Sequence, residues 1–282
     1  MLHKFRVIMR VGVVFSGLAL CAIAIPLIAQ FIDGGSIRVG KAKAAETNGP
    51  RQSDQAFVDP VSRRLLRQMG KHLADAREFA FRADITNDVV QGEAQKIQYG
   101  GTANIAVRRP NNLHVSYSGE ERQTRTYYDG RTFTILDAAK MVYTKTAVPP
   151  VIDAALDKIF AQHGFSVPIA DLVYQDPYRT LIENVETGFL VGRPLINGRA
   201  TFHLAFTQKE IDWQIWIEDG PQPLPLKLLI TYKNEPGSPQ YTAIFSGWDF
   251  QPRLSDSFAE FYPPIGSDEI QFLKLTNLPA RN

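Results

Sequence analysis

Cysteine is almost absent from this chain of 282 residues, which contains only one, Cys21. A disulfide within the chain would need a second thiol, and a zinc-finger type of metal site would need several. The five histidines do not stand at metal-ligand spacings either. The sequence therefore predicts no bound metal, and packing has to supply the stability of the fold.

Short catalytic motifs are missing as well. The chain has no H-E-x-x-H, no G-x-S-x-G and no glycine-rich phosphate loop, the patterns that mark zinc proteases, serine hydrolases and nucleotide-binding proteins. Acidic pairs such as Glu120 and Glu121 are typical of solvated turns, because a catalytic carboxylate pair needs an enclosing pocket. We therefore expect neither a cofactor nor an enzymatic activity.

The net positive charge of the chain comes from its first 44 residues. The whole chain has 31 basic and 29 acidic residues, a net charge of +2, and six of the basic and one of the acidic residues lie in that segment. The remaining residues therefore carry a net charge of −3. They lack the overall basic character of a nucleic-acid-binding domain, so no nucleic-acid partner is expected.

Long uncharged runs are confined to the N-terminus. Basic residues up to Arg10 precede a run from Val11 to Ile32 without a charge, which is typical of export with the basic head left in the cytoplasm. The run is long enough to span a bilayer, and Ala42-Lys43-Ala44 offers a signal-peptidase site. Residues 1–44 are thus predicted to be a signal peptide or an inner-membrane anchor. The rest should lie in the periplasm, soluble after cleavage and membrane-anchored without it.

Residues 45–58 are polar and small, and we interpret them as a linker. A helix is predicted to begin after Asp59, because Asp is a preferred N-cap and Pro60 suits the first helical position. Its apolar stripe consists of Val61, Leu65, Met69 and Leu73.

After Arg77 the apolar period changes to two, which indicates half-buried antiparallel strands, about eleven in all. Asp129-Gly130 predicts a two-residue hairpin turn in which residues 128 and 131 pair. A helical insert from Ile152 to His163 is expected to cover one face of the sheet and to lie above Leu204.

A second hairpin is predicted between residues 201 and 217. With 207–210 as its connection, Phe206 pairs with Ile211 and Leu204 with Trp213 on a wholly apolar face. The reverse face places His203 opposite Gln214. A polar and aromatic cluster of His203, Gln214 and Trp216 is therefore a candidate site, and its simpler interpretation is a cross-strand hydrogen bond beside a packed tryptophan.

Several motifs resemble a family of predicted periplasmic proteins of unknown function. They include Asp212-Trp213-Gln214-Ile215-Trp216, Pro223-Leu224-Pro225-Leu226 and Tyr128-Asp129-Gly130, within roughly residues 57–275. That family is in turn similar to the LolA and LolB lipoprotein carriers. The resemblance implies a mainly β (α+β) fold: a LolA-like incomplete antiparallel β-barrel, with helices capping its concave face, over residues 59–275, followed by a tail at 276–282.

An incomplete barrel with a helical lid can leave an apolar groove on its concave face. We expect this groove to bind a lipid, a lipoprotein acyl chain or another apolar ligand, as a carrier or sensor. The alternative is a protein-interaction module of a cell-envelope complex that uses Trp216 and Trp248 as surface anchors. The simpler interpretation of any one of the candidate lining residues is dry core. The candidates are Phe79, Phe81, Ile85, Leu113, Val115, Tyr117, Phe133, Ile135, Phe202, Leu204, Phe206, Trp213 and Ile215.

Overall fold

The computed structural model describes residues 57–92, 95–163 and 167–271. The predicted leader, most of the linker and the C-terminal tail lie outside these ranges. Among the described residues, none of the helices combines the length and the apolar character that crossing a membrane requires.

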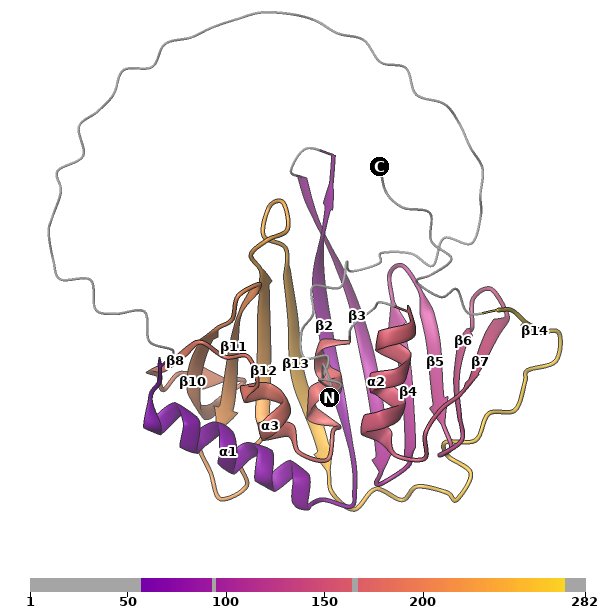
Figure 1. Cartoon of the computed structure of the whole chain (residues 1–282), viewed down its shortest axis with the longest axis horizontal. Coiled ribbons are helices and arrows are strands. Elements are labelled where there is room, and N and C mark those ends of the chain that lie inside the picture. The colour runs from indigo at the N-terminus through magenta and orange to yellow at the C-terminus, as the bar shows by residue number, and fades with distance from the viewer. Residues whose placement is uncertain (1–56, 93–94, 164–166, 272–282) are drawn as a thin grey trace, which may run out of the picture. The chain divides into compact units, whose positions relative to one another are not determined.

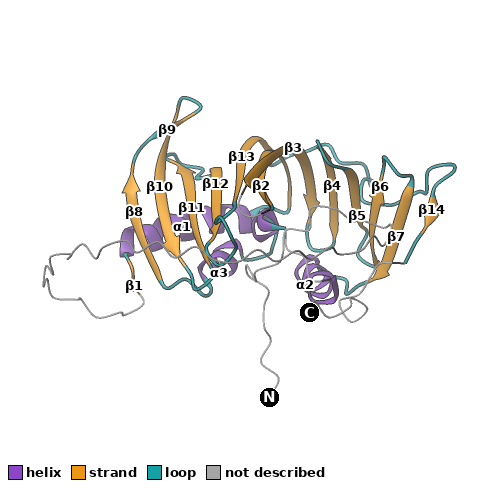
Figure 2. Ribbon diagram, turned by 90° about the horizontal axis from the view of Figure 1, so that it is seen from above, coloured by secondary structure: helices purple, strands orange, loops and turns teal. Residues whose placement is uncertain are grey.

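The described chain forms one sheet of fourteen strands with helices on its concave side (Figures 1 and 2). The helices are α1 (Pro60–Asp75), α2 (Ile152–His163), the 3₁₀ helix η1 (Pro168–Leu172) and α3 (Pro177–Ile182). The strands are β1 (Phe57–Val58), β2 (Glu78–Gln91), β3 (Gln95–Arg108), β4 (Asn112–Gly119), β5 (Gln123–Tyr128), β6 (Thr132–Asp137), β7 (Val142–Ala147), β8 (Thr187–Gly192), β9 (Leu195–Ile196), β10 (Arg199–Thr207), β11 (Ile211–Glu218), β12 (Pro225–Tyr232), β13 (Gln240–Asp249) and β14 (Asp268–Glu269).

The sheet stays open, because its path runs from β1 at one edge to β14 at the other, in the order β1-β8-β10-β11-β12-β13-β2-β3-β4-β5-β6-β7-β14. The predicted incomplete antiparallel barrel with capping helices is therefore confirmed. Three strands, β1, β9 and β14, have only two residues each. The other eleven account for the predicted number.

Two meanders build the sheet from its centre. The chain runs outward from β2 to β7, crosses the concave side through α2, η1 and α3, and enters β8 near the opposite edge (Figure 1). It then returns inward until β13 pairs with β2. Figure 2 shows α1 and α3 over the half of the sheet that contains β8 and β10–β13, and α2 over the half that contains β4–β7.

Helix α1 begins where the sequence predicts. The Oδ1 atom of Asp59 accepts hydrogen bonds from the backbone N–H groups of Val61 and Ser62, at 2.8 and 3.0 Å, and Oδ2 accepts one from Leu190 in β8 at 3.1 Å. The N-cap therefore also ties the helix to the edge of the sheet. At Gly70 an added Cβ would lie 2.6 Å from Cβ of Tyr178, so glycine allows α1 and α3 to pack closely.

In both predicted hairpins each residue pairs with a partner two positions further along the chain than predicted. A shift of two keeps every side chain on its predicted face. Tyr128 pairs with Phe133 rather than with residue 131, because Oδ1 of Asp129 accepts hydrogen bonds from the N–H groups of Arg131 and Thr132 and widens the turn. Phe206 likewise pairs with Trp213 rather than with Ile211.

Candidate apolar binding face

All thirteen candidate lining residues lie on the concave face. The ladders connect them in rows across the sheet, for example Phe81 with Ile105 and Ile105 with Val115. Four are half-buried: Val115, Tyr117, Ile135 and Phe202. Nine are buried: Phe79, Phe81, Ile85, Leu113, Phe133, Leu204, Phe206, Trp213 and Ile215.

The half of the concave face that α1 and α3 cover is dry around Leu204, and of the candidate lining residues there only Phe202 in β10 is half-buried. Leu204, Trp213 and Ile215 are each 0% exposed, so no space wide enough for water borders them. The rings of Phe206 and Trp213 stack with their centroids 4.2 Å apart. This contradicts the prediction at one point: the helix over this region is not the insert at Ile152–His163 but α1, whose backbone lies close to β8 and β11 on either side of β10.

Aromatic side chains fill the middle of the concave face. Phe81 stacks on Trp248 with a centroid distance of 4.3 Å and meets Phe245 edge-on at 6.0 Å. The indole N–H of Trp248 donates to the carbonyl of Pro225 at 3.2 Å. Trp248 is therefore part of the packing and is not the exposed anchor that the alternative hypothesis assumed.

A part-open strip remains on the half of the face that α2 covers. It crosses four neighbouring strands, since Val115 pairs with Thr126, Thr126 with Ile135, and Ile135 with Thr144. Val115, Thr126 and Ile135 are half-buried, and the hydroxyl of buried Thr144 has no hydrogen-bond partner. We call these four residues the β4–β7 strip. It offers apolar surface and one unsatisfied polar group to whatever lies against it.

Tyrosines bound the apolar face beyond this strip. The ring of Tyr117 lies over Gly101 and Gly119, where an added Cβ would approach its hydroxyl to 2.4 Å. Burial raises the pKa of Tyr117, Tyr232 and Tyr241 above the usual value of about 10. These hydroxyls therefore stay neutral at physiological pH.

A buried arginine, which the sequence did not point to, closes the lower end of the face. The guanidinium of Arg109 donates to the carbonyls of Leu73 and Ala76 at 2.7 Å, and to those of Tyr174 and Val173 at 2.6 and 3.3 Å. Burial lowers its pKa to about 10, so it remains charged. It thus joins the end of α1 to the segment after η1, and nothing distinguishes it in sequence from neighbouring Arg108.

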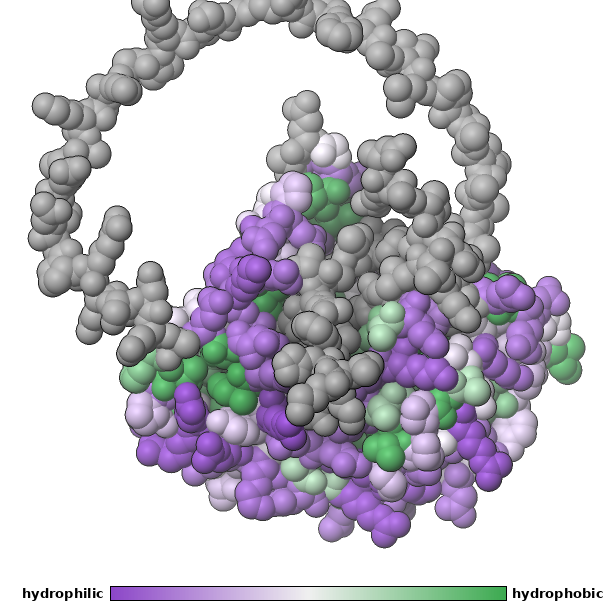
Figure 3. Space-filling model, in the orientation of Figure 1, coloured by the Kyte–Doolittle hydropathy of each residue, from purple (hydrophilic) through white to green (hydrophobic). Residues whose placement is uncertain are grey.

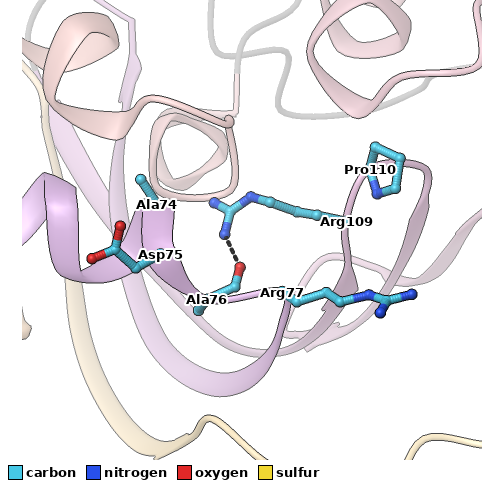
Figure 4. Close-up of a pocket in the computed structure, with 6 residues that line it drawn as sticks. All are labelled: Ala74, Asp75, Ala76, Arg77, Arg109 and Pro110. Atoms are coloured by element: carbon cyan, nitrogen blue, oxygen red, sulfur yellow. Dashed lines mark hydrogen bonds between the residues drawn. The ribbon is translucent and has the colours of Figure 1, made fainter.

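The wall of a shallow pocket next to this arginine is shown in Figure 4. The pocket has a volume of about 440 Å³ and is lined by Ala74, Asp75, Ala76, Arg77, Arg109 and Pro110. A second pocket of about 570 Å³ lies between the β5–β6 turn and the C-terminal segment, lined by Asn111, Asp129, Gly130, Arg131, Pro150, Glu260, Phe261 and Tyr262. Neither pocket includes any of the thirteen candidate lining residues.

Asp171 is a buried carboxylate at the crossing between the two halves. It lies in η1, is 6% exposed, and burial raises its pKa to about 8. Nearby, the hydroxyl of Tyr174 donates to Oδ1 of Asp157 in α2 at 2.9 Å, and Oδ1 of Asp153 accepts from the N–H of Gln175 at 3.0 Å. These bonds attach α2 to the crossing segment.

The predicted polar cluster is assembled on the convex face. Nε2 of His203 lies 2.9 Å from Oε1 of Gln214, and the imidazole stacks on Trp216 with a centroid distance of 4.0 Å. Nζ of Lys227 lies 4.6 Å from the centre of the same indole ring. Burial lowers the pKa of His203. The hydrogen bond that its Nε2 donates to Oε1 of Gln214 raises the pKa, and the charge of Lys227 lowers it. Trp216 is only 7% exposed, so it is not a surface anchor either.

Comparison with known proteins shows the family. The family model described as "Predicted periplasmic protein (DUF2092)" matches residues 62–273, so the chain belongs to this family. The resemblance expected from the sequence is confirmed, and the description gives the same predicted location, the periplasm. A comparison with curated proteins finds no match.

Solved structures with a similar course of the chain come from several bacteria. An uncharacterised conserved protein from Thermus thermophilus has 10% identity and a TM-score of 0.44, covering 75% of this chain and 99% of its own. The lipoprotein LppX from Mycobacterium tuberculosis has 12% identity and a TM-score of 0.44, covering 70% and 100%. A LolA superfamily protein from Nitrosomonas europaea has 9% identity and a TM-score of 0.36, covering 71% and 97%.

The site has no arrangement for metal chemistry within the ranges that the structure describes, since no three His, Cys, Asp or Glu side chains gather closely enough to hold an ion. What the concave face offers is apolar contact, a few hydroxyls and one half that is less completely covered than the other. Such a surface can bind an apolar molecule by excluding water.

Proposed function

We propose that this protein binds the acyl chain of a lipid or lipoprotein in the periplasm, as a carrier or sensor. The observation that supports this is the β4–β7 strip, a continuous part-exposed row on the half of the apolar concave face under α2. Strands are spaced about 4.8 Å apart, so the strip runs about 14 Å from β4 to β7. An acyl chain laid along it would gain about 0.8 kcal/mol for each methylene removed from water.

The strip continues toward the centre of the molecule in the same row. Val115 is followed by Ile105 and then by Phe81, both buried. A chain that lies on the strip would therefore have its far end against the central aromatic packing. The unpartnered hydroxyl of Thr144 at the β7 end of the strip, and the hydroxyl of Tyr117 on β4, could accept a hydrogen bond from or donate one to an ester or carboxyl group.

Ile135→Glu tests this proposal, because it places a charge in the middle of the strip. We expect the variant to stay folded and to lose at least about tenfold in affinity for a fluorescent fatty-acid probe. In the complex the bound acyl chain would cover the new carboxylate and remove it from water. Ile244→Glu is the matched control. Ile244 is half-buried on the convex face, between buried Ala243 and Phe245 of the concave face.

Equal affinities of the two variants for the probe would contradict the proposed site, and a wild-type chain that does not bind the probe would contradict the function. Native mass spectrometry of protein purified from its own envelope adds an independent readout. A lipid that co-purifies with the wild-type chain and not with Ile135→Glu would identify the ligand.

An interaction module of an envelope complex is the second candidate, favoured by a different surface. Four apolar side chains near the β8 edge are strongly exposed: Phe57 at 62%, Phe189 at 54%, Val191 at 49% and Leu195 at 67%. Exposed apolar groups in one region are typical of protein contacts. If this function holds, Phe189→Ser with Leu195→Ser should abolish cross-linking to an envelope protein in cells and leave uptake of the probe unchanged.

A further inference from the structure

The outward face of α1 carries a line of positive charge. Arg63, Arg64, Arg67 and Lys71 are all exposed, and we call them the α1 basic stripe. Lys71 pairs with Asp75 at 2.6 Å, whereas Arg63 and Arg64 have no ion pair among the described residues. The surface over α1 is mainly hydrophilic (Figure 3).

Apart from the pair between Lys71 and Asp75, the stripe does not stabilise the helix. Arg63 with Arg67, and Arg67 with Lys71, are like charges four residues apart, and such pairs destabilise a helix. The first turn has no acidic residue, and Arg63 and Arg64 lie in the N-terminal half, where the helix dipole disfavours positive charge. The buried face of α1 already supplies its packing, through Leu65, Leu66, Met69 and Leu73.

The sign of the stripe is also opposite to that of the chain around it. The residues after the predicted leader carry a net charge of −3, yet this helix has one acidic residue against four arginines and lysines. Arg179, exposed on neighbouring α3, extends the positive region. A concentration of one sign on a domain of the other points to a partner of complementary charge.

We propose that the α1 basic stripe docks the protein on an anionic phospholipid surface. The stripe lies on a single helix of 16 residues and extends over about 12 Å of it at 1.5 Å per residue. It runs along one edge of the molecule (Figure 1), so a flat surface can meet all four charges at once. Clusters of four or more Lys and Arg on an amphipathic helix are typical of binding to anionic lipids.

Arginine and tyrosine at this face suit the lipid headgroup region. Guanidinium groups bind phosphate oxygens through two parallel hydrogen bonds, and tyrosine is enriched where membranes meet water. Tyr178 of α3 lies beside the stripe, with the guanidinium carbon of Arg67 5.0 Å from the centre of its ring. None of the four stripe residues lines either of the two pockets described above, although Asp75, the partner of Lys71, lines the first.

Vesicle co-sedimentation tests the proposal with the chain as it is recovered from the envelope. Vesicles of phosphatidylcholine alone are compared with vesicles that also contain phosphatidylglycerol, at low and high salt. We expect wild type to prefer the anionic vesicles by at least about tenfold at low salt, and salt to weaken this preference because surface charges are screened. The variant Arg63→Gln, Arg64→Gln, Arg67→Gln and Lys71→Gln should lose it.

The matched control removes four exposed positive charges elsewhere: Lys96→Gln, Lys140→Gln, Lys209→Gln and Arg253→Gln. It should retain most of the preference for anionic vesicles. The proposal would be overturned if the two quadruple variants lost the preference for anionic vesicles equally, or if wild type bound both vesicle types alike. Binding of the stripe to an acidic protein without binding to anionic vesicles would also overturn it. Substituting the three arginines by Lys keeps the charge and should keep binding, which separates charge from fold.

Docking is independent of the proposed ligand site. The quadruple variant of α1 should take up the fatty-acid probe like wild type when no vesicles are present. Ile135→Glu should in turn dock on anionic vesicles like wild type. Failure of one function therefore leaves the other readable.

Discussion

The two halves of the concave face are built from the same alternating pattern of apolar and polar residues, but their apolar side chains are buried to different extents. Under α1 and α3, Leu204 and Trp213 are completely buried, whereas on the half under α2, Val115 and Ile135 are only half-buried. All four are apolar residues of antiparallel strands that point to the same face. The difference therefore depends on the cover above each strand and not on the strand itself.

The largest effect is expected for a charge in the sealed half. Leu204→Glu buries an unpaired carboxylate and should cost several kcal/mol, enough to unfold a domain of ordinary stability. Urea unfolding measures this, with Leu204→Met, a change of nearly constant volume, as the control that should cost less than about 1.5 kcal/mol. A folded Leu204→Glu chain that loses only the probe would mean that the two halves are alike.

Asp171 tests whether the crossing between the halves is as dry as the sealed half. Its pKa is about 8 when folded against 3.8 for an ordinary Asp. The folded chain therefore holds a proton that the unfolded chain releases, and its contribution to stability is lost as the pH rises from about 4 through 8. Asp171→Asn lacks this loss and should exceed wild type in stability at pH 8 by on the order of a few kcal/mol.

Thermal unfolding of both chains at pH 5 and pH 8 gives the comparison. The advantage of Asp171→Asn should grow with pH. A constant difference would show that the carboxylate is solvated and that the crossing segment is open to water.

A smaller effect is expected when the cap that fastens the cover is removed. Asp59→Ala deletes the hydrogen bonds to Val61, Ser62 and Leu190 and should cost about 1–2 kcal/mol. Hydrogen exchange should then be faster in α1 and β8 and little changed in α2. Asp59→Asn can keep the bonds to Val61 and Ser62 and loses the acceptor for Leu190, so it should cost less than Asp59→Ala and leave exchange in α1 nearly unchanged. Faster exchange throughout the sheet would argue against a local fastening.

The smallest effect belongs to the part-open half. Ile135→Glu should cost under about 1 kcal/mol in the same urea experiment, because its carboxylate can reach solvent. Together with Leu204→Glu it makes the same kind of change on both halves of one face. Similar costs for the two variants would remove the distinction on which the proposed ligand site depends.

Period-two patterning was enough to predict faces and not enough to predict partners. In the hairpin at Phe206 each residue pairs with a partner two positions further along than predicted. Side chains alternate with a period of two, so this shift leaves each one on its predicted face of the sheet. Its connection has no glycine, asparagine or proline to fix the turn. At Asp129 a side-chain hydrogen bond to the backbone, which periodicity does not detect, chose the longer turn.

The other features that the sequence did not predict depend on long-range contacts. The helical insert was predicted with its correct residues but placed over Leu204, whereas it lies on the opposite half, where the N–H of Ile152 donates to the carbonyl of Pro110 at 2.9 Å. The hydrogen bonds of Arg109 join it to Leu73 and Tyr174, each more than thirty positions away along the chain. Such pairings depend on how the two meanders close on one another, which no local pattern records.

The short terminal strands have a consequence for solubility. An open barrel has two free edges, and unpaired edges invite other chains to add strands and aggregate. Here the edges are blunted from both ends of the described chain: Phe57–Val58 pairs with β8 and Asp268–Glu269 with β7, both in parallel. Each covers two residues, and the acidic pair adds charge to one edge. A chain that ended before Asp268 would lose the pairing at Val142 and Tyr143, and we expect it to associate more readily through the β7 edge.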